Sequence, residues 1–372
     1  MNPFSLLVKP TSADCNLRCR YCFYLEKAEI YPDSRRHRMS DAVLERMIAS
    51  YLETKQPCHA FGWQGGEPTL MGLDFFKRVT DLQSSIGRPG TIVANGFQTN
   101  GVLLDDDWAK HFAQYNFLVG VSVDGPAKIH DRFRVDAGGR GTHSRVLAGI
   151  GALRRNGAEF NVLTLVSQSN VAHPEAVYDS LCDMGVLFHQ YIECVEFDAR
   201  GRLRPFAITG REWGEFLCRI FDRWIARDAH RVSVRLFDTI LTQMVDGASN
   251  TCAAGCSCDR YFVVEHNGDI YPCDFNVLPE LRLGNVQTEA WDAMQTSTVY
   301  RRFAAVKSQW NASCDACPWL RFCHGDCPKN RPGRIPGSLS HLCDGWRRFY
   351  AHAVPHLLPF AEEIRRGRAE SR

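Results

Sequence analysis

The chain carries near its start the segment Cys15-Asn16-Leu17-Arg18-Cys19-Arg20-Tyr21-Cys22, which follows the strand-like run Ser5-Leu6-Leu7-Val8. The segment places three thiols at C-x3-C-x2-C spacing. A structural zinc takes four protein ligands, and an ordinary iron–sulfur cluster is held by four cysteines. We therefore expect a metal centre with one position open to a reacting molecule. A zinc loop and three unrelated buried cysteines remain alternatives at this point, because spacing alone does not choose the metal.

The composition is that of a globular protein with a sizeable core. The chain has 372 residues, of which 45% are hydrophobic and 23% charged, with a formal net charge of +2. This length suits one large domain plus a smaller one, and the charge balance argues against nucleic acid as the main partner. Residues 1–7 lack a basic leader region, and no stretch of about 18 consecutive apolar residues occurs. We expect no membrane partner and a cytoplasmic location.

Sixteen cysteines are an unusual number for a chain of this size. Disulfide-rich secreted domains are much shorter, so metal binding is the better explanation in a cytoplasmic protein. Three cysteines lie in the opening segment, and most of the others lie between Cys252 and Cys343. Four lie among apolar neighbours and are predicted to be small buried hydrophobic residues, namely Cys58, Cys182, Cys194 and Cys218.

Short apolar runs alternate with helical stretches from Ser5 to about Arg235, as in βα units with a parallel sheet. The predicted strands are Ser5–Lys9, Ala60–Gln64, Thr91–Gln98, Phe117–Val123, Phe160–Val166 and Phe188–Glu193. The predicted helices are Asp41–Glu53, Leu73–Ser84, Asp105–Gln114, Ser144–Asn156, Pro174–Met184 and Gly210–Arg227. Such units form a barrel or partial barrel with functional groups on the loops after the strands. We predict this core over residues 1–235 and a cysteine-rich, metal-stabilised domain over residues 236–372, with an Asn-Gly hairpin at Phe262–Tyr271.

Candidate ligand-binding residues follow several predicted strands. Gln64-Gly65-Gly66-Glu67-Pro68 follows the second strand, where two glycines permit close approach of the backbone to a ligand, although they also suit an ordinary tight turn. Ser122 and Arg134 are candidates to meet a ligand above the barrel mouth, because Arg suits a planar carboxylate. Taken singly, each of these two residues is more typical of a structural role.

The second group of cysteines is a strong independent signal for metal. It reads Cys314-x2-Cys317-x5-Cys323-x3-Cys327, followed by Cys343 and preceded by Cys252, Cys256, Cys258 and Cys273. Thiolates at such short spacing repel one another and attract metal ions, and their number suffices for two four-thiolate centres. A pair of zinc sites remains an alternative. Asp274 directly follows Cys273 between aromatic residues and is a candidate general base.

Together these motifs resemble those of the anaerobic sulfatase-maturating enzymes, which are radical S-adenosylmethionine (AdoMet, SAM) proteins with a C-terminal SPASM domain. The stretches that carry the resemblance are Lys9-Pro10, Cys15–Tyr24, Gln64–Leu70, Gln98–Gly101, Phe117–Pro126, Phe262–Phe275, Leu283–Asn285 and Cys314–Cys327. The resemblance implies an α/β fold: a partial (β/α)6 radical SAM barrel and a cysteine-rich SPASM domain that holds two auxiliary clusters.

The resemblance also implies a role for individual residues. AdoMet and three [4Fe-4S] clusters are the implied cofactors, and Cys15, Cys19 and Cys22 match the ligands of the AdoMet cluster. Positions that contact AdoMet are matched by Tyr21, Gly66, Ser122, Arg134 and Val195. The ligands of the first auxiliary cluster are matched by Cys252, Cys258, Cys273 and Cys327, and those of the second by Cys314, Cys317, Cys323 and Cys343. Cys256 is an additional thiol, so the choice between Cys256 and Cys258 stays open; Asp274 matches the catalytic base.

The implied reaction oxidises a cysteine or serine of an unfolded sulfatase polypeptide to Cα-formylglycine, with cleavage of AdoMet to methionine and 5′-deoxyadenosine. Candidate substrate contacts are Tyr24, Gln64 and Gln98. The implied partners are the sulfatase polypeptide and an electron donor such as flavodoxin or ferredoxin. One alternative is another SPASM peptide maturase that crosslinks a precursor peptide, and a second is a non-catalytic zinc protein.

Overall fold

The computed structural model describes residues 2–32 and 34–370 of the chain. Its internal contacts divide the chain into two compact units, each built from several segments. Unit 1 comprises Met1–Val123, Asp131–Asn161 and Cys258–Ala304. Unit 2 comprises Asp124–His130, Val162–Ser257 and Ala305–Arg372.

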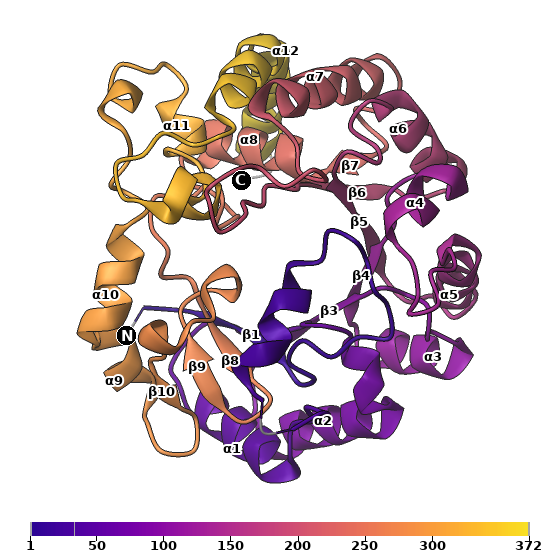
Figure 1. The fold of residues 1–372 in the computed structure, drawn as a ribbon, viewed down its shortest axis with the longest axis vertical. Helices are drawn as coiled ribbons and strands as arrows, with labels where there is room; N and C mark the ends of the chain where they lie inside the picture. The colour runs from indigo at the N-terminus through magenta and orange to yellow at the C-terminus, as the bar shows by residue number, and fades with distance from the viewer. Residues whose placement is uncertain (1, 33, 371–372) are drawn as a thin grey trace. The chain divides into compact units, whose positions relative to one another are not determined.

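The sheet of unit 1 brings distant parts of the sequence together (Figure 1). Four strands pair in parallel in the order of the sequence: β1 (Ser5–Lys9), β2 (His59–Trp63), β3 (Val93–Thr99) and β4 (Leu118–Ser122). On the other side of β1 lie β8 (Tyr261–Glu265), again parallel, and then the antiparallel β9 (Asp269–Tyr271) and β10 (Gly284–Asn285). Because parallel strands end at one edge of a sheet, the loops after β1, β2, β3, β4 and β8 share that edge.

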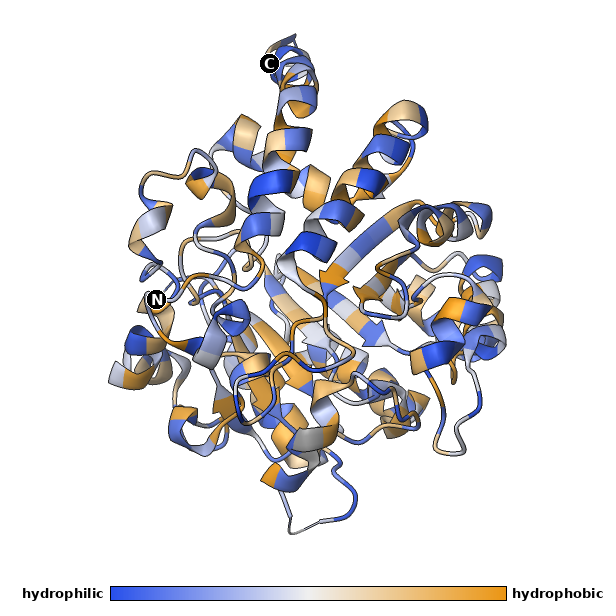
Figure 2. Cartoon of the chain, turned by 45° about the horizontal axis from the view of Figure 1, so that its top comes forward, coloured by the Kyte–Doolittle hydropathy of each residue, from blue (hydrophilic) through white to orange (hydrophobic). Residues whose placement is uncertain are grey.

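The helices of unit 1 pack their apolar faces on this sheet. The long ones are α1 (Asp41–Leu52), α2 (Leu73–Ile86), α3 (Asp106–Gln114) and α5 (His143–Arg155). Ser40 caps helix α1, since its hydroxyl accepts a hydrogen bond from the Val43 N–H at 3.3 Å, and Asp105 caps α3 in the same way. Such caps satisfy backbone donors that the first turn leaves unpaired. Figure 2 shows the helices banded in hydrophilic and hydrophobic residues, the pattern of half-buried helices.

Unit 2 contains most of β5 (Phe160–Val166), together with β6 (Phe188–Glu193) and β7 (Ser233–Val234), which pair in parallel. Its main helices are α6 (Pro174–Asp183), α7 (Gly210–Arg227), α8 (Arg235–Asp246) and α12 (Cys343–Glu370). The first turns of α7 and α12 touch through glycine, since a Cβ on Gly345 would lie 2.0 Å from the Gly210 carbonyl oxygen. Helix α12 begins two residues before this contact, at Cys343.

Shorter elements complete the chain. The α-helices are α4 (Ala127–Phe133), α9 (Trp291–Thr296), α10 (Thr298–Ala305) and α11 (Leu320–Cys323). The 3-10 helices are η1 (Phe23–Ile30), η2 (Pro68–Met71), η3 (Asp274–Asn276), η4 (Pro279–Leu281), η5 (Ala312–Cys314), η6 (Pro328–Asn330) and η7 (Pro332–Arg334). Among the described residues, no helix combines the length and hydropathy needed to cross a lipid bilayer.

The structure confirms the α/β class and all of the predicted strands and helices, with ends that agree to within two residues. The predicted hairpin at Phe262–Tyr271 is present as β8 and β9. The sequence did not predict the parallel pairing of β1 with β8, nor the 28-residue helix α12. That pairing joins strands far apart in the chain, and neither strand carries a local signal for its partner.

Candidate active site and cluster sites

The first cysteine segment is held in place by strand-like contacts with residues 133–136. The Arg18 N–H donates to the Val135 carbonyl at 2.8 Å, and the Arg20 N–H donates to the Phe133 carbonyl at 3.0 Å. An isolated bridge joins Leu17 to the same segment. These bonds shape the backbone of the loop without using its thiols.

The three thiols of this loop lie within electrostatic range of one another. Burial, then the charge of Glu67, and then the neighbouring Cys19 and Cys22 raise the pKa of Cys15 to about 12, against a lowering hydrogen bond from the Leu17 N–H. Burial also raises the pKa of Cys22. A bound metal lowers the pKa of a thiol that coordinates it. Even thiols with raised pKa values therefore lose their protons when they bind a metal.

The two glycines after β2 pack directly against residues 12–14, which immediately precede the cysteine segment. A Cβ on Gly66 would lie 2.0 Å from the Asp14 carbonyl oxygen, and a Cβ on Gly65, where φ is +116°, would lie 2.7 Å from the Ser12 carbonyl oxygen. The Gly66 N–H donates to that Ser12 oxygen at 2.8 Å. These glycines thus allow a close backbone approach to residues 12–14 of the chain itself, and their predicted approach to a ligand stays a prediction.

Glu67 connects the loop after β2 to the loop after β3. This carboxylate is fully buried. Its Oε1 accepts from the Thr69 N–H at 3.1 Å, the Thr69 hydroxyl at 2.7 Å and the Thr99 hydroxyl at 2.8 Å. Its Oε2 accepts from the Asn100 N–H at 2.7 Å. Burial raises the pKa of Glu67, although these hydrogen bonds act in the opposite direction.

Four of the five predicted AdoMet contacts belong to unit 1, and the structure pairs two of them. The Arg134 guanidinium lies over the Tyr21 ring, 5.4 Å from its centroid, and both residues are buried. Ser122 accepts a hydrogen bond from the Gln98 amide at 3.2 Å, and Gly66 lies against Asp14, just before the cysteine segment. The fifth, Val195, is a buried residue of unit 2.

Asp274 lies in a buried cluster of polar side chains in unit 1. Its Oδ2 accepts hydrogen bonds from the Tyr24 hydroxyl and from the Gln64 amide, the latter at 3.1 Å. Its Oδ1 lies 3.5 Å from the Lys9 Nζ and, within the described residues, accepts no hydrogen bond. One carboxylate oxygen is therefore anchored by two hydrogen bonds, and the other is buried and faces the Lys9 ammonium.

Lys9 and Glu265 form the base of this cluster. They stand opposite each other in the pairing of β1 with β8, and the Lys9 Nζ lies 2.6 Å from the Glu265 Oε1. Burial lowers the pKa of Lys9, but the charges of Glu265 and Asp274 outweigh it, so that the pKa is raised overall. Burial and the Asp274 charge raise the pKa of Tyr24 well above its usual value, so its hydroxyl is a donor.

Sequence reasoning missed Lys9 and Glu265 as members of this site. A weak signal was present, because each is the charged residue that ends a strand of otherwise apolar character. A third missed residue is Lys27, which donates to the Asp274 carbonyl and whose pKa burial lowers to about 8.

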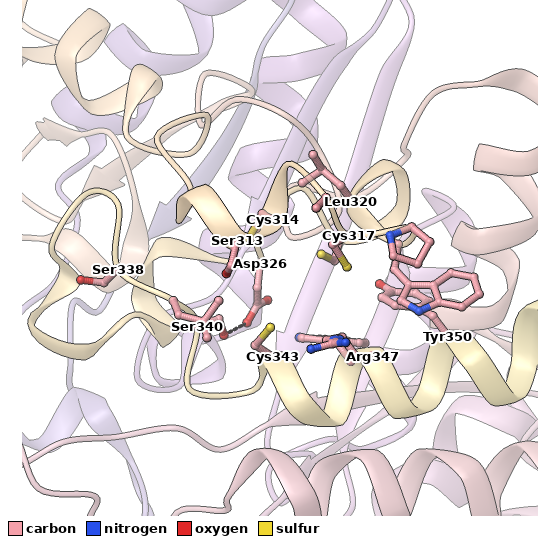
Figure 3. A pocket seen from close by; sticks show the side chains of 17 residues that line it. Ser313, Cys314, Cys317, Leu320, Asp326, Ser338, Ser340, Cys343, Arg347 and Tyr350 are labelled. Atoms are coloured by element: carbon pink, nitrogen blue, oxygen red, sulfur yellow. Dashed lines mark hydrogen bonds between the residues drawn. The ribbon is translucent and has the colours of Figure 1, made fainter.

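In unit 2, the four cysteines predicted for the second auxiliary cluster line one cavity (Figure 3). The cavity measures about 250 Å³, and its lining includes Cys314, Cys317, Cys323 and Cys343 together with Trp319, Trp346 and Tyr350. Burial and the neighbouring thiols raise the pKa of Cys314 and Cys343. Burial raises the pKa of Cys323 to about 11.

This cavity suits a group of several atoms. A water molecule occupies about 30 Å³ of liquid, so 250 Å³ exceeds the needs of a single ion. Across residues 2–32 and 34–370, no three His, Cys, Asp or Glu side chains are arranged to hold one metal ion. The four thiols thus line a cavity and do not converge on one atom. The aromatic residues of the same lining limit solvent access to a metal centre bound there.

The structure divides the predicted first auxiliary set between the two units. Cys258 and Cys273 belong to unit 1, whereas Cys252 and Cys327 belong to unit 2. The Tyr261 hydroxyl donates to the Cys273 sulfur at 3.4 Å. The choice between Cys256 and Cys258 as the ligand of this cluster stays open. Cys256 is exposed and Cys258 is partly buried.

Comparison with known proteins shows to which class of enzyme the chain belongs. The family model of the radical SAM superfamily matches residues 10–181, and that of an iron–sulfur cluster-binding domain matches residues 256–318. The protein is therefore a radical SAM enzyme with an iron–sulfur domain, and AdoMet and iron–sulfur clusters are its cofactors, as predicted.

Full-length relatives narrow this class to one family. The serine-type anaerobic sulfatase-maturating enzyme of Bacteroides thetaiotaomicron is 35% identical over 95% of this chain and 90% of the relative. The cysteine-type enzyme of Clostridium perfringens is 34% identical over 98% of this chain and 100% of the relative. The solved structure of native anSMEcpe with bound AdoMet and Cp18Cys peptide covers 98% of this chain and all of its own, with 34% identity and a TM-score of 0.90. The chain belongs to the family of anaerobic sulfatase-maturating enzymes.

Proposed function

We propose that this enzyme oxidises a cysteine or serine side chain of a sulfatase polypeptide to Cα-formylglycine. The observation that carries the proposal is the position of Asp274, whose anchoring partner Tyr24 lies two residues after the last cysteine of the first segment. A buried carboxylate is thereby held beside the loop that binds the radical-generating cluster. The names of the full-length relatives support the same substrate class.

The proposed roles of the residues follow from their contacts. AdoMet, when bound at the cluster of Cys15, Cys19 and Cys22, supplies the radical chemistry that removes hydrogen from the target Cβ. Tyr21, Gly66, Ser122, Arg134 and Val195 are proposed to hold AdoMet. Tyr24 and Gln64 fix Oδ2 of Asp274, so that its Oδ1 is directed to take the proton of the target thiol or hydroxyl.

The auxiliary clusters are proposed to accept the remaining electron. The cavity in unit 2 supports Cys314, Cys317, Cys323 and Cys343 as ligands of the second cluster. Cys252, Cys258, Cys273 and Cys327 are proposed for the first. We further propose residues 1–235 as the radical SAM core and 236–372 as the cluster domain, a cytoplasmic location, and flavodoxin or ferredoxin as the electron donor.

Iron content tests the ligand assignment. Anaerobically reconstituted protein should be brown and hold about twelve irons, four for each of three clusters. Cys343→Ala should lower this number to about eight, because one corner of the second cluster loses its thiolate. Cys218→Ala, a buried cysteine of unit 2 with no proposed ligand role, should leave iron unchanged. Stoichiometric zinc in colourless protein would refute the cluster assignment.

The substrate proposal is tested with two synthetic sulfatase-motif peptides that differ only by Cys or Ser at the target. Reconstituted enzyme with AdoMet and reductant should convert at least one of them to the formylglycine peptide and release 5′-deoxyadenosine, both measured by mass spectrometry. The identities to serine-type and cysteine-type relatives are nearly equal, so both peptides are needed. A crosslinked product, or 5′-deoxyadenosine with neither peptide changed, would count against this function.

A further inference from the structure

We propose that Asn100 is a positioning residue that tunes the AdoMet cluster by donating an N–H to the sulfur of Cys15. The inference rests on the proposed function only in taking Cys15 as a ligand of that cluster. It assigns a role to a side chain that makes no direct bond to iron.

The contacts of Asn100 fix which way its amide points. Its Oδ1 accepts from the Val102 N–H at 3.0 Å, so the Nδ2 group faces the other way. That Nδ2 donates to the Asn16 Oδ1 at 2.7 Å and lies 3.7 Å from the Cys15 sulfur, within the range of an N–H···S hydrogen bond. The Leu17 N–H donates to the same sulfur at 3.3 Å. Cys15 thus receives one backbone donor and one side-chain donor.

Asn100 is itself held by a rigid support. Its backbone N–H donates to the Glu67 Oε2 at 2.7 Å, and the neighbouring Thr99 hydroxyl donates to the Glu67 Oε1 at 2.8 Å. Glu67 is fully buried, and Asn100 is 8% exposed. A carboxylate with its acceptor sites filled in this way leaves the loop after β3 little freedom, so the donor stays aimed at the sulfur.

Hydrogen bonds to ligand sulfurs are one of the factors that set the reduction potential of an iron–sulfur cluster. A donor offsets part of the negative charge on the thiolate and therefore favours the reduced cluster.

Two variants test this role through the potential of the cluster. Asn100→Leu keeps the size of the side chain and removes the donor, and Asn100→Asp keeps the shape and replaces the donor with an acceptor. At a fixed solution potential, the ratio of reduced to oxidised AdoMet cluster should fall about tenfold in the first variant, which corresponds to 59 mV for one electron, and further in the second. The readout is potentiometric titration followed by electron paramagnetic resonance, with the AdoMet-dependent change of the signal identifying the cluster.

Asn156→Leu is the matched control, because Asn156 is an amide of unit 1 that bonds to Asp106 and should leave the potential unchanged. An unchanged ratio in both Asn100 variants, with full iron, would overturn the proposal. Loss of the cluster from both would also overturn it, since Asn100 would then serve assembly rather than tuning. A wild-type protein without an AdoMet-responsive cluster would instead refute the proposed function, so the two failures are distinguishable.

Discussion

Asp274→Asn protein should retain its iron and its AdoMet binding, yet form formylglycine about a thousand times more slowly than the wild type. Asparagine has the shape of aspartate, and its carbonyl oxygen can still accept from Tyr24 and Gln64. It has no basic oxygen to take the proton of the target side chain. Iron analysis, AdoMet binding and mass spectrometry of the peptide product measure the three properties separately.

The control for this variant is Asp292→Asn, which makes the same chemical change on the exposed face of α9 and should leave the rate unaltered. 5′-Deoxyadenosine should still appear in Asp274→Asn samples, because the carboxylate acts on the target and not on AdoMet. Formylglycine production above about a tenth of the wild-type rate would show that another group serves as the base.

Local sequence signals were sufficient to predict most of the elements and the thiols. Apolar runs of five to seven residues predicted β1 to β6, because alternating βα units impose that pattern on each strand separately. The spacing of Cys314, Cys317 and Cys323 likewise reflects one short segment, and the structure places all three on one cavity. In both cases the information lies within a few neighbouring residues.

Such local signals could not predict contacts between segments that are distant in the sequence. The pairing of β1 with β8 joins residues about 250 positions apart, and it places part of the predicted second domain in unit 1. The partners of Asp274 come from β1 and from the loops after β1 and β2. Resemblance to a family supplied Asp274 as the proposed base, but only the fold shows that Lys9 and Glu265 lie beside it.

Replacing Lys9 by methionine should lower the free energy of unfolding by about 3–5 kcal/mol, the usual cost of removing one partner from a buried ion pair. Methionine fills a similar volume but leaves the carboxylates of Glu265 and Asp274 without the cation that both face. Anaerobic urea unfolding of the holoenzyme, followed by tryptophan fluorescence, measures the difference. Lys77→Met, which breaks an exposed pair with Asp74, should change the same quantity by less than about 1 kcal/mol.

The pH dependence of the stability lost in Lys9→Met tests whether the loss comes from the charge of Lys9. Because the folded-state pKa of Lys9 is raised above its usual 10.5, the lysine contributes its full stabilisation below pH 10.5 and loses it only as the pH rises through the folded-state value. The stability contributed by the Lys9 charge should therefore persist up to pH 10.5, and the gap between wild type and Lys9→Met should close only in more alkaline solution. Lys9→Met combined with Glu265→Gln should recover part of the loss, because it removes one of the stranded charges. A double variant no more stable than Lys9→Met alone would mean that packing around the lysine stem, and not its charge, holds β1 to β8.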